Sequence, residues 1–227
     1  MLLWFVSTLL TLAYAFPDIE LIDIEIDAAG TVWLLPASDP AVIRVESDGL
    51  QSRFETGVAG LPTGIAVSPT GRWAVSFQSP GALCRFDRDD VLVEQMDIPS
   101  SGDVLFSGLT IWTIDNASGC VISTDGDVIA RNCADRDSRF SSMRAGQVIV
   151  SGPAGVFLVE AGETPERIAN HGSACFSPEG ILLLKDGVLQ IFQGEIILTD
   201  IPWSRVSASP DEETVILWGN VAPLVLE

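Results

Sequence analysis

Three stretches of the chain share one turn pattern: AVSPTG at 66–71, CFSPEG at 175–180 and SASPDE at 207–212. In each stretch Pro follows Ser. Pro fixes φ at the second position of a tight turn, and the Gly or acidic residue that comes soon after lets the chain reverse. A strand rich in Val, Ile, Leu and Trp follows each turn. The three stretches therefore predict one repeated strand-turn-strand unit.

Further copies of this unit are anchored at Gly30, Gly108 and Gly146, so that successive anchors lie about 32 to 41 residues apart. Such spacing is typical of propeller blades. Most units continue into a third and a fourth apolar strand, and four Trp residues recur after the turns at positions that suit packing between neighbouring blades. The sequence predicts one all-β domain over residues 16–227, a six-bladed β-propeller with about four strands per blade.

The two ends of the repeat array suggest how the ring closes. The last unit stops at its third strand, APLVLE at 222–227, and an extra strand, DIELI at 18–22, precedes the first unit. An N-terminal strand that completed the last blade would remove two exposed sheet edges. We therefore expect the N-terminal strand to join the last blade.

The first residues form an apolar run from Met1 to Phe16 with a small-x-small pattern at 13–15. This run is short for a membrane span and is typical of a secretory signal peptide over residues 1–15. An uncleaved anchor is the alternative, because no Lys or Arg precedes the run. We expect a secreted or periplasmic protein with no membrane attachment after cleavage.

The net charge of the chain is −19, from 31 Asp and Glu against 12 Lys and Arg. A polyanion would be repelled over most of such a surface, which argues against nucleic acid as a partner. The chain also contains no Walker loop, G-x-S-x-G or H-E-x-x-H pattern, and these absences argue against the commonest nucleotide, serine-hydrolase and zinc-protease sites.

The four cysteines are too few for a disulfide scaffold but suit an oxidising compartment. Cys120 and Cys133 flank the turn at 124–127, so a hairpin centred there would place them nearly opposite each other. The sequence predicts a disulfide between them. Buried free thiols are the alternative.

The segment LPTGIAVSPTG at 61–71 resembles the NHL-repeat and related six-bladed propellers, in which a Pro-x-Gly-Ile-Ala stretch opens the inner strand of a blade. The resemblance covers one blade in sequence and the remainder only in rhythm. Such propellers include lactonases and lyases with a metal at the axis, as well as binding modules. The resemblance implies the architecture and does not choose among these functions.

In a propeller, the loops that join blades and those between second and third strands gather on one face, where ligands are expected. The candidate ligand-binding residues in these predicted loops are Asp39, Gln78, Asp115, Asn116, His171, Trp203 and Asn220. The same loops also carry Asp135, Arg136, Asp137, Asp186, Asp200 and Arg205.

Two functions fit these residues. The first is a non-catalytic, monomeric binding or scaffold module without a cofactor, whose partner is a protein, a peptide or a glycan, because no catalytic set is recognisable. The second is a metal-dependent hydrolase or lactonase with oxygen ligands at the axis. Oxygen ligands suit Ca²⁺ or Mg²⁺, and the candidate ligands are Asp39, Asp115, Asn116 and Asn220.

Overall fold

The computed structural model describes residues 19–46, 48–79, 81–209, 212, 214–219 and 223–226. The signal-peptide prediction for residues 1–15 and the candidate Asn220 lie outside these residues. Among the described residues no helix is long and apolar enough to cross a membrane.

The predicted turns all reverse the chain, but only the copies at 68–71 and 209–212 share one geometry, because at 177–180 Ser177 pairs directly with Gly180 in a tighter hairpin. At 68–71, the Gly71 N–H donates to the Ser68 carbonyl oxygen at 2.9 Å, and the Arg72 N–H donates to Ser68 Oγ at 3.0 Å. Gly71 has φ +78°, a left-handed conformation that Gly adopts without a steric cost. In the last copy Glu212 takes the same conformation, with φ 65°, and donates to the Ser209 carbonyl oxygen at 2.8 Å.

Six antiparallel sheets follow one another along the chain, and each is a meander of consecutive strands. The strands of the first three sheets are β1 (Leu21–Ile26), β2 (Val32–Pro36), β3 (Ala41–Val45), β4 (Gln51–Glu55), β5 (Leu61–Val67), β6 (Trp73–Ser79), β7 (Ala82–Phe86), β8 (Leu92–Asp97), β9 (Ser101–Ser107), β10 (Thr110–Asp115), β11 (Cys120–Ser123) and β12 (Val128–Ala130). The strands of the other three are β13 (Arg139–Arg144), β14 (Gln147–Gly152), β15 (Gly155–Glu160), β16 (Glu166–Ala169), β17 (Ser173–Ser177), β18 (Gly180–Lys185), β19 (Val188–Ile191), β20 (Ile196–Leu198), β21 (Arg205–Ala208), β22 (Val215–Trp218) and β23 (Leu224–Leu226).

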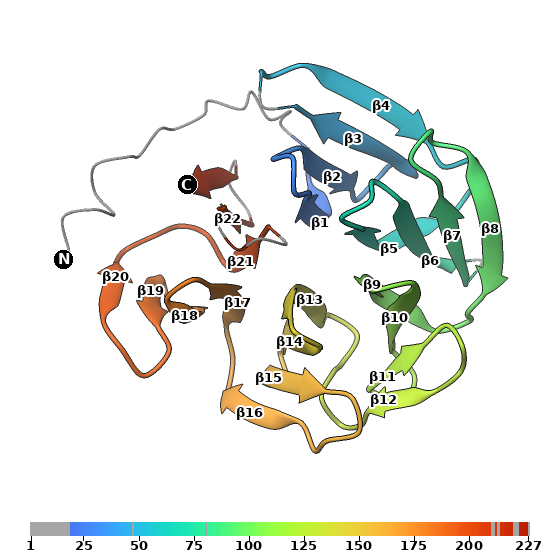
Figure 1. The fold of residues 1–227 in the computed structure, drawn as a ribbon. Helices are drawn as coiled ribbons and strands as arrows, with labels where there is room; N and C mark the ends of the chain where they lie inside the picture. Colours follow the sequence, from blue (N-terminus) through green and yellow to red (C-terminus); the bar gives the residue numbers. More distant parts are fainter. Residues whose placement is uncertain are drawn as a thin grey trace.

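The sheets stand around a central axis as the blades of a propeller (Figure 1). Five blades have four strands each, and the last sheet, β21-β22-β23, has three. The first strand of each blade lies nearest the axis, and the later strands lie progressively outward. The predicted all-β propeller is confirmed, with five four-stranded blades and a shorter sixth sheet.

The predicted ring closure is wrong. The N-terminal strand β1 pairs with β2 as the inner strand of the first blade, from Ile26 opposite Val32 to Leu21 opposite Pro36. Among the described residues, the last sheet contains no N-terminal strand. The physical reason is that β1 uses one edge for β2 and turns its other edge to the axis, so it cannot also be the outer strand of another blade.

Side-chain packing closes the ring instead. Six separate clusters of buried apolar side chains lie between the blades, one at each interface. The cluster between the last and first sheets joins Ile216 and Trp218 of β22 to Ile24 and Leu34 of the first blade. Burial of apolar surface at this interface thus replaces the backbone pairing that we expected.

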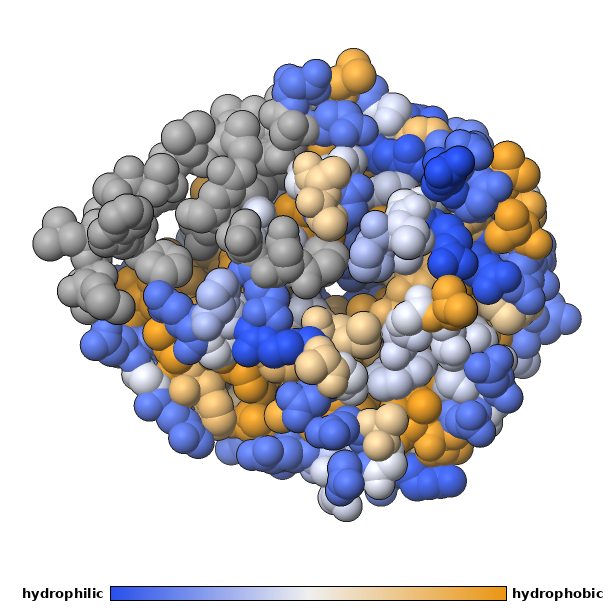
Figure 2. Space-filling view, viewed as in Figure 1, coloured by the Kyte–Doolittle hydropathy of each residue, from blue (hydrophilic) through white to orange (hydrophobic). Residues whose placement is uncertain are grey.

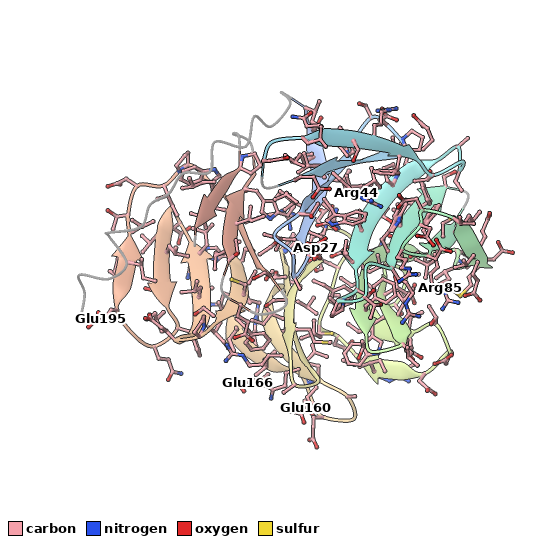
Figure 3. The ribbon with its side chains drawn as sticks, turned by 45° about the horizontal axis from the view of Figure 1, so that its top comes forward. Asp27, Arg44, Arg85, Glu160, Glu166 and Glu195 are labelled. Atoms are coloured by element: carbon pink, nitrogen blue, oxygen red, sulfur yellow. The ribbon has the colours of Figure 1, made fainter. Side chains whose placement is uncertain are left out.

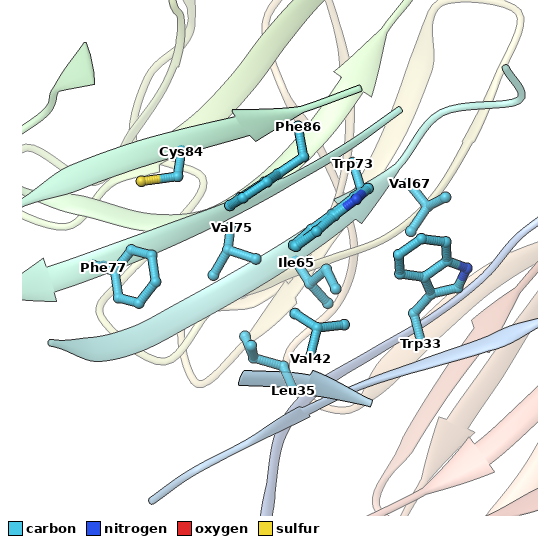
Figure 4. Packing of buried hydrophobic residues seen from close by; sticks show 10 residues of the cluster. All are labelled: Trp33, Leu35, Val42, Ile65, Val67, Trp73, Val75, Phe77, Cys84 and Phe86. Carbon is cyan, nitrogen blue, oxygen red and sulfur yellow. The ribbon is translucent and has the colours of Figure 1, made fainter. Parts of the chain in front are cut away.

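The predicted role of the tryptophans is confirmed. The four that follow the turns, Trp33, Trp73, Trp112 and Trp218, are all buried in clusters between blades. Figure 4 shows the interface of the first two blades, where the ring of Trp73 stacks on Phe86 and Trp33 lies close by.

Arg44 contacts both blades at the same interface. Its guanidinium lies 4.0 Å from the centre of the Trp33 ring and 3.9 Å from that of Phe54, and it forms an ion pair with Asp90 of the second blade. Asp90 also accepts a hydrogen bond from Trp73 Nε1 at 2.9 Å. Figure 3 labels Arg44 where the first two blades meet.

The inner strands have a free edge toward the axis, and side chains of neighbouring blades satisfy part of it. Such bonds matter because an unpaired buried N–H costs free energy. The N–H groups of four inner strands each donate to a side-chain oxygen of the preceding blade: Ile65 to Asp23 at 2.9 Å, Phe140 to Asp103 at 2.6 Å, Phe176 to Ser142 at 2.8 Å and Val206 to Ser173 at 3.1 Å.

Candidate functional site

The loops that the sequence analysis identified lie at one end of the ring. Because each blade is an antiparallel meander, its second strand ends on the side where its first strand begins. The loops between blades and those after the second strands therefore share this side, which we call the entry face. The described candidates lie there: Asp39, Gln78, Asp115, Asn116, His171 and Trp203.

Three of the described candidates have local roles. Asp39 forms an ion pair with Arg53, and this hydrogen bond lowers the pKa of Asp39 from its ordinary value. Asp115 accepts hydrogen bonds from Ala117 and Ser118 within its own turn. Asn116 lies against Gly102 of β9, and its Oδ1 is buried with no hydrogen-bond partner in the described part of the chain.

Among the described residues, Asp39 and Asp115 are not part of a group of acidic, His or Cys side chains. Within the described ranges no three His, Cys, Asp or Glu side chains are grouped so that they could hold a metal ion. Asp39 and Asp115 instead belong to the first and third blades and are each engaged with close neighbours.

Three other candidates have different surroundings. His171 Nε2 lies 3.1 Å from Oδ1 of Asp186, and both side chains are exposed. Trp203 is partly buried against the cluster between the last two blades. Gln78 Oε1 accepts a hydrogen bond from Arg136 Nη2 at 3.4 Å, which connects the second blade to the loop before the fourth.

The sequence analysis did not identify a charged group on the inner strands, of which it named only Arg205, as a loop residue. The group consists of Asp23 and Glu25 on β1, Asp103 on β9, Arg139 on β13 and Arg205 on β21. These residues come from four blades, yet they interact electrostatically with one another. Side chains of non-adjacent blades can meet only at the axis, so we call these five residues the axial cluster. In the space-filling view the ring is hollowed near its centre (Figure 2).

The acids of the axial cluster are strongly perturbed by burial. Asp23 and Asp103 are 2% and 1% exposed, and their carboxyl groups are within hydrogen-bonding reach of each other. Burial raises the pKa of Asp23, and burial together with the charge of Asp23 raises the pKa of Asp103 well above its ordinary value. Burial and the charges of both aspartates likewise hold the pKa of Glu25 well above its usual range.

The two arginines lie nearer the entry face, because each is the first residue of its strand. Arg139 Nη1 donates to the Ser138 carbonyl oxygen at 2.9 Å, but its Nε is buried without a hydrogen-bond partner among the described residues. The guanidinium of Arg205 lies 5.3 Å from the centre of the Trp218 ring. Burial and the charge of Arg139 lower the pKa of Arg205 from its usual value.

A signal for this cluster was present in the sequence. The strand before each anchor turn is the inner strand of a blade, so LIDIEI at 21–26, before Gly30, had to line the axis. Charged residues within such an otherwise apolar inner strand are costly unless they are paired or functional. Because the sequence analysis assigned the N-terminal strand to the outer edge of the last blade, it did not place Asp23 and Glu25 at the axis.

The structure contains the alternative to the predicted disulfide, which is a set of buried free thiols. Cys120 and Cys133 are free thiols, as are Cys84 and Cys175. Val121 pairs with Ala130 at a register shift, and the Cys133 N–H donates to Gly119 across the hairpin, so the two cysteines are not directly opposite. Burial and the nearby Cys120 raise the pKa of Cys133 to about 11, which disfavours the thiolate needed for oxidation.

The axial acids predict a pH-dependent stability. A carboxyl whose pKa is higher in the folded than in the unfolded chain takes up a proton on folding, so the free energy of unfolding falls as pH rises between the two pKa values. Lowering the pH from about 7.5 to about 5 should therefore raise stability by about 1 kcal/mol or more, or about 2–4 °C in Tm. Thermal unfolding at a series of pH values measures this.

The control for this prediction separates the axial acids from the general acidity of the chain. Asp103→Asn removes one titrating group of the cluster and should reduce the pH slope. Glu166→Gln removes an exposed carboxylate at the rim (Figure 3) and should leave the slope unchanged. Equal slopes in Asp103→Asn and the natural protein would contradict the assignment.

Comparison with known proteins supports the architecture. No family model and no curated protein matches the chain. Among solved structures, it is similar to virginiamycin B lyase from Staphylococcus aureus at 10% identity and a TM-score of 0.63, covering 90% of this chain and 79% of that one. It is also similar to a gluconolactonase from Xanthomonas campestris at 14% identity and a TM-score of 0.65, covering 95% and 88%. A third similar chain, from Kuenenia stuttgartiensis hydrazine synthase, has 12% identity and a TM-score of 0.60, covering 93% and 96%. At these identities the likeness shows that this chain has the propeller fold, which also carries lyases and lactonases.

Proposed function

We propose that the protein is an exported, monomeric binding propeller without catalytic activity, which holds a protein, peptide or glycan partner on its entry face. The observation that carries this proposal is the axial cluster, in which charged side chains of four blades converge beneath one face. A rigid ring that presents a polar centre and variable loops is suited to binding.

The composition of the entry face favours binding over metal-dependent hydrolysis. Asp39 and Asp115 are engaged locally, and no group of metal-ligating side chains forms among the described residues. In contrast, the face offers the Gln78–Arg136 contact and, elsewhere on the ring, the partly buried Trp203. Arginine and aromatic side chains are both enriched at interfaces. The net charge of −19 weighs against nucleic acid as the partner.

Immobilised protein screened against peptide libraries and glycan arrays tests the proposal. We expect at least one class of ligand to bind, and Arg136→Glu to weaken that binding at least about tenfold, since a charge-assisted hydrogen bond is worth about 1.5–3 kcal/mol. The matched control is Arg88→Glu, because Arg88 is exposed in the β7–β8 hairpin on the opposite face.

Two outcomes would overturn the proposal. One is binding that responds to Arg88→Glu but is unaffected by Arg136→Glu, which would place the partner on the wrong face. The other is turnover of lactones or esters that requires an added divalent metal and is lost in Asp115→Ala.

A further inference from the structure

Arg139 and Arg205 differ from the ion-paired arginines of this chain. Arg44, Arg53, Arg85 and Arg144 each have a carboxylate within ion-pair distance. Arg139 and Arg205 have none within 4.0 Å in the described part of the chain, although both are partly buried. Arginine does not lose its charge in proteins, so two such groups near each other at the axis repel.

The acids deeper in the axial cluster do not neutralise the arginines fully. Asp23 and Asp103 are held by backbone N–H groups: those of Ile24 and Ile65 on Asp23, and those of Val104 and Phe140 on Asp103. Because the pKa of Asp103 and that of Glu25 lie well above their ordinary values, part of the acid charge is replaced by bound protons. Asp137, on the exposed loop before β13, also acts on Arg205, but its effect is the smallest of the charges there and solvent screens it. The two guanidinium groups are therefore only partly compensated, and no carboxylate lies within ion-pair distance of either among the described residues.

The positions of the two arginines favour a ligand that enters from one end. As the first residues of β13 and β21, they lie toward the entry face, whereas Asp23, Asp103 and Glu25 lie two to four residues deeper along their strands. Both arginines keep part of their surface accessible. An anion could thus reach the guanidinium groups without passing Asp23, Asp103 or Glu25, and on the entry face it would meet only the solvent-exposed Asp137 near Arg205.

We propose that Arg139 and Arg205 together bind one carboxylate group at the entry to the propeller axis. The carboxylate belongs either to a small organic acid or to the C-terminus of a peptide, and the proposal rests on the binding function above. The planar guanidinium matches a carboxylate in two parallel hydrogen bonds. Within the described residues, Nη2 of Arg139 and the guanidinium of Arg205 donate no hydrogen bond and are the donors available for them. A doubly charged anion such as phosphate fits less well, because the acids below would repel its second charge.

Side-chain NMR of the full protein tests the proposal at the two residues themselves. The probes are N-acetylglycine, its neutral amide N-acetylglycinamide, and inorganic phosphate. We expect N-acetylglycine to shift the Nε–Hε resonances of Arg139 and Arg205 saturably, while the amide has no effect and phosphate binds more weakly. The resonances are assigned from Arg139→Lys and Arg205→Lys, which keep the positive charge but lose the guanidinium fork.

The same Lys variants should weaken N-acetylglycine binding at least about tenfold, which corresponds to the loss of about 1.4 kcal/mol. Arg53→Lys is the matched control, because Arg53 is exposed and paired with Asp39 at the periphery. A degenerate hexapeptide library with free C-termini, compared with the same library as C-terminal amides, separates the two sources of the carboxylate. Tighter binding of the free-acid library assigns the peptide, and equal binding of both libraries with retained N-acetylglycine binding assigns the small acid.

Three results would overturn the proposal: equal binding of N-acetylglycine and its amide, a preference for phosphate, or no shift of either arginine resonance at about 10 mM ligand. That concentration is well above the Kd of even a weak site, about 1 mM. The binding function fails separately, since it is judged by the Arg136→Glu and Arg88→Glu variants on the arrays. A partner that needs Arg136 but ignores the carboxylate would leave that function standing and remove this assignment.

Discussion

Replacing Trp73 by Ala should lower the free energy of unfolding by about 3–5 kcal/mol, the usual cost of deleting a fully buried aromatic side chain. Trp73 is 1% exposed, its ring stacks on Phe86 with the ring centres 3.8 Å apart, and its Nε1 donates to Asp90. Because the side chain fills the interface between the first two blades (Figure 4), the cavity would open inside the ring. For a chain of this size the loss lowers Tm by about 10 °C, measured by calorimetry.

The control separates the ring from its hydrogen bond. Trp73→Phe keeps an aromatic ring beside Phe86 but removes the donor to Asp90, so it should cost about 1 kcal/mol for the bond and somewhat more for the lost volume. If Trp73→Ala cost no more than Trp73→Phe, the packing of this interface would not be what holds the first two blades together.

Replacing Gly64 by Ala should destabilise the protein by about 2–4 kcal/mol through a clash at the axis, the upper range for overpacking a tight site. A Cβ at position 64 would clash with Oδ1 of Asp103 and lie 2.7 Å from its Cα. The backbone of β9 must move to make room, and this movement pulls Asp103 away from the Phe140 N–H that it holds at 2.6 Å. Chemical denaturation of the variant measures the loss.

The matched control is Gly126→Ala in the β11–β12 turn. Gly126 has φ +90° and open space where a Cβ would be, so Ala there carries only the backbone cost of about 1–2 kcal/mol. Gly64→Ala should cost more, and should also alter the pH slope of stability, because Asp103 belongs to the axial cluster. A Gly64→Ala variant as stable as the natural protein would show that the inner strands are not packed this closely.

The blades were predictable because their signals are local. Pro and Gly in the turns at 66–71, 175–180 and 207–212 fix the positions of reversal, and the apolar runs after them can only be buried strands. The tryptophans after those turns were also predictable as interface residues, since their size and their spacing relative to the turn are properties of the sequence. The repeated rhythm of these units then indicates a ring of sheets.

The candidate site was predictable only in part. The choice of the entry face followed from the antiparallel strand order, and the described loop candidates do lie on it. Which of them would meet did not follow from the sequence, because the Gln78–Arg136 and His171–Asp186 contacts depend on loop conformations. The pairing of Asp39 with Arg53 likewise did not follow from the sequence.

By itself the sequence determined the strands, the turns, the faces of burial and the propeller architecture, because each depends on residues near one another in the chain. Only the tertiary structure decided how the ring closes and which charges share the axis. Asp23, Asp103, Arg139 and Arg205 come from four blades, and the closing interface joins residues about 190 positions apart, Ile24 and Ile216. Contacts between residues so far apart in the chain depend on the geometry of the whole ring. The pKa values of the charged groups at the axis depend on their burial, which no local sequence pattern indicates.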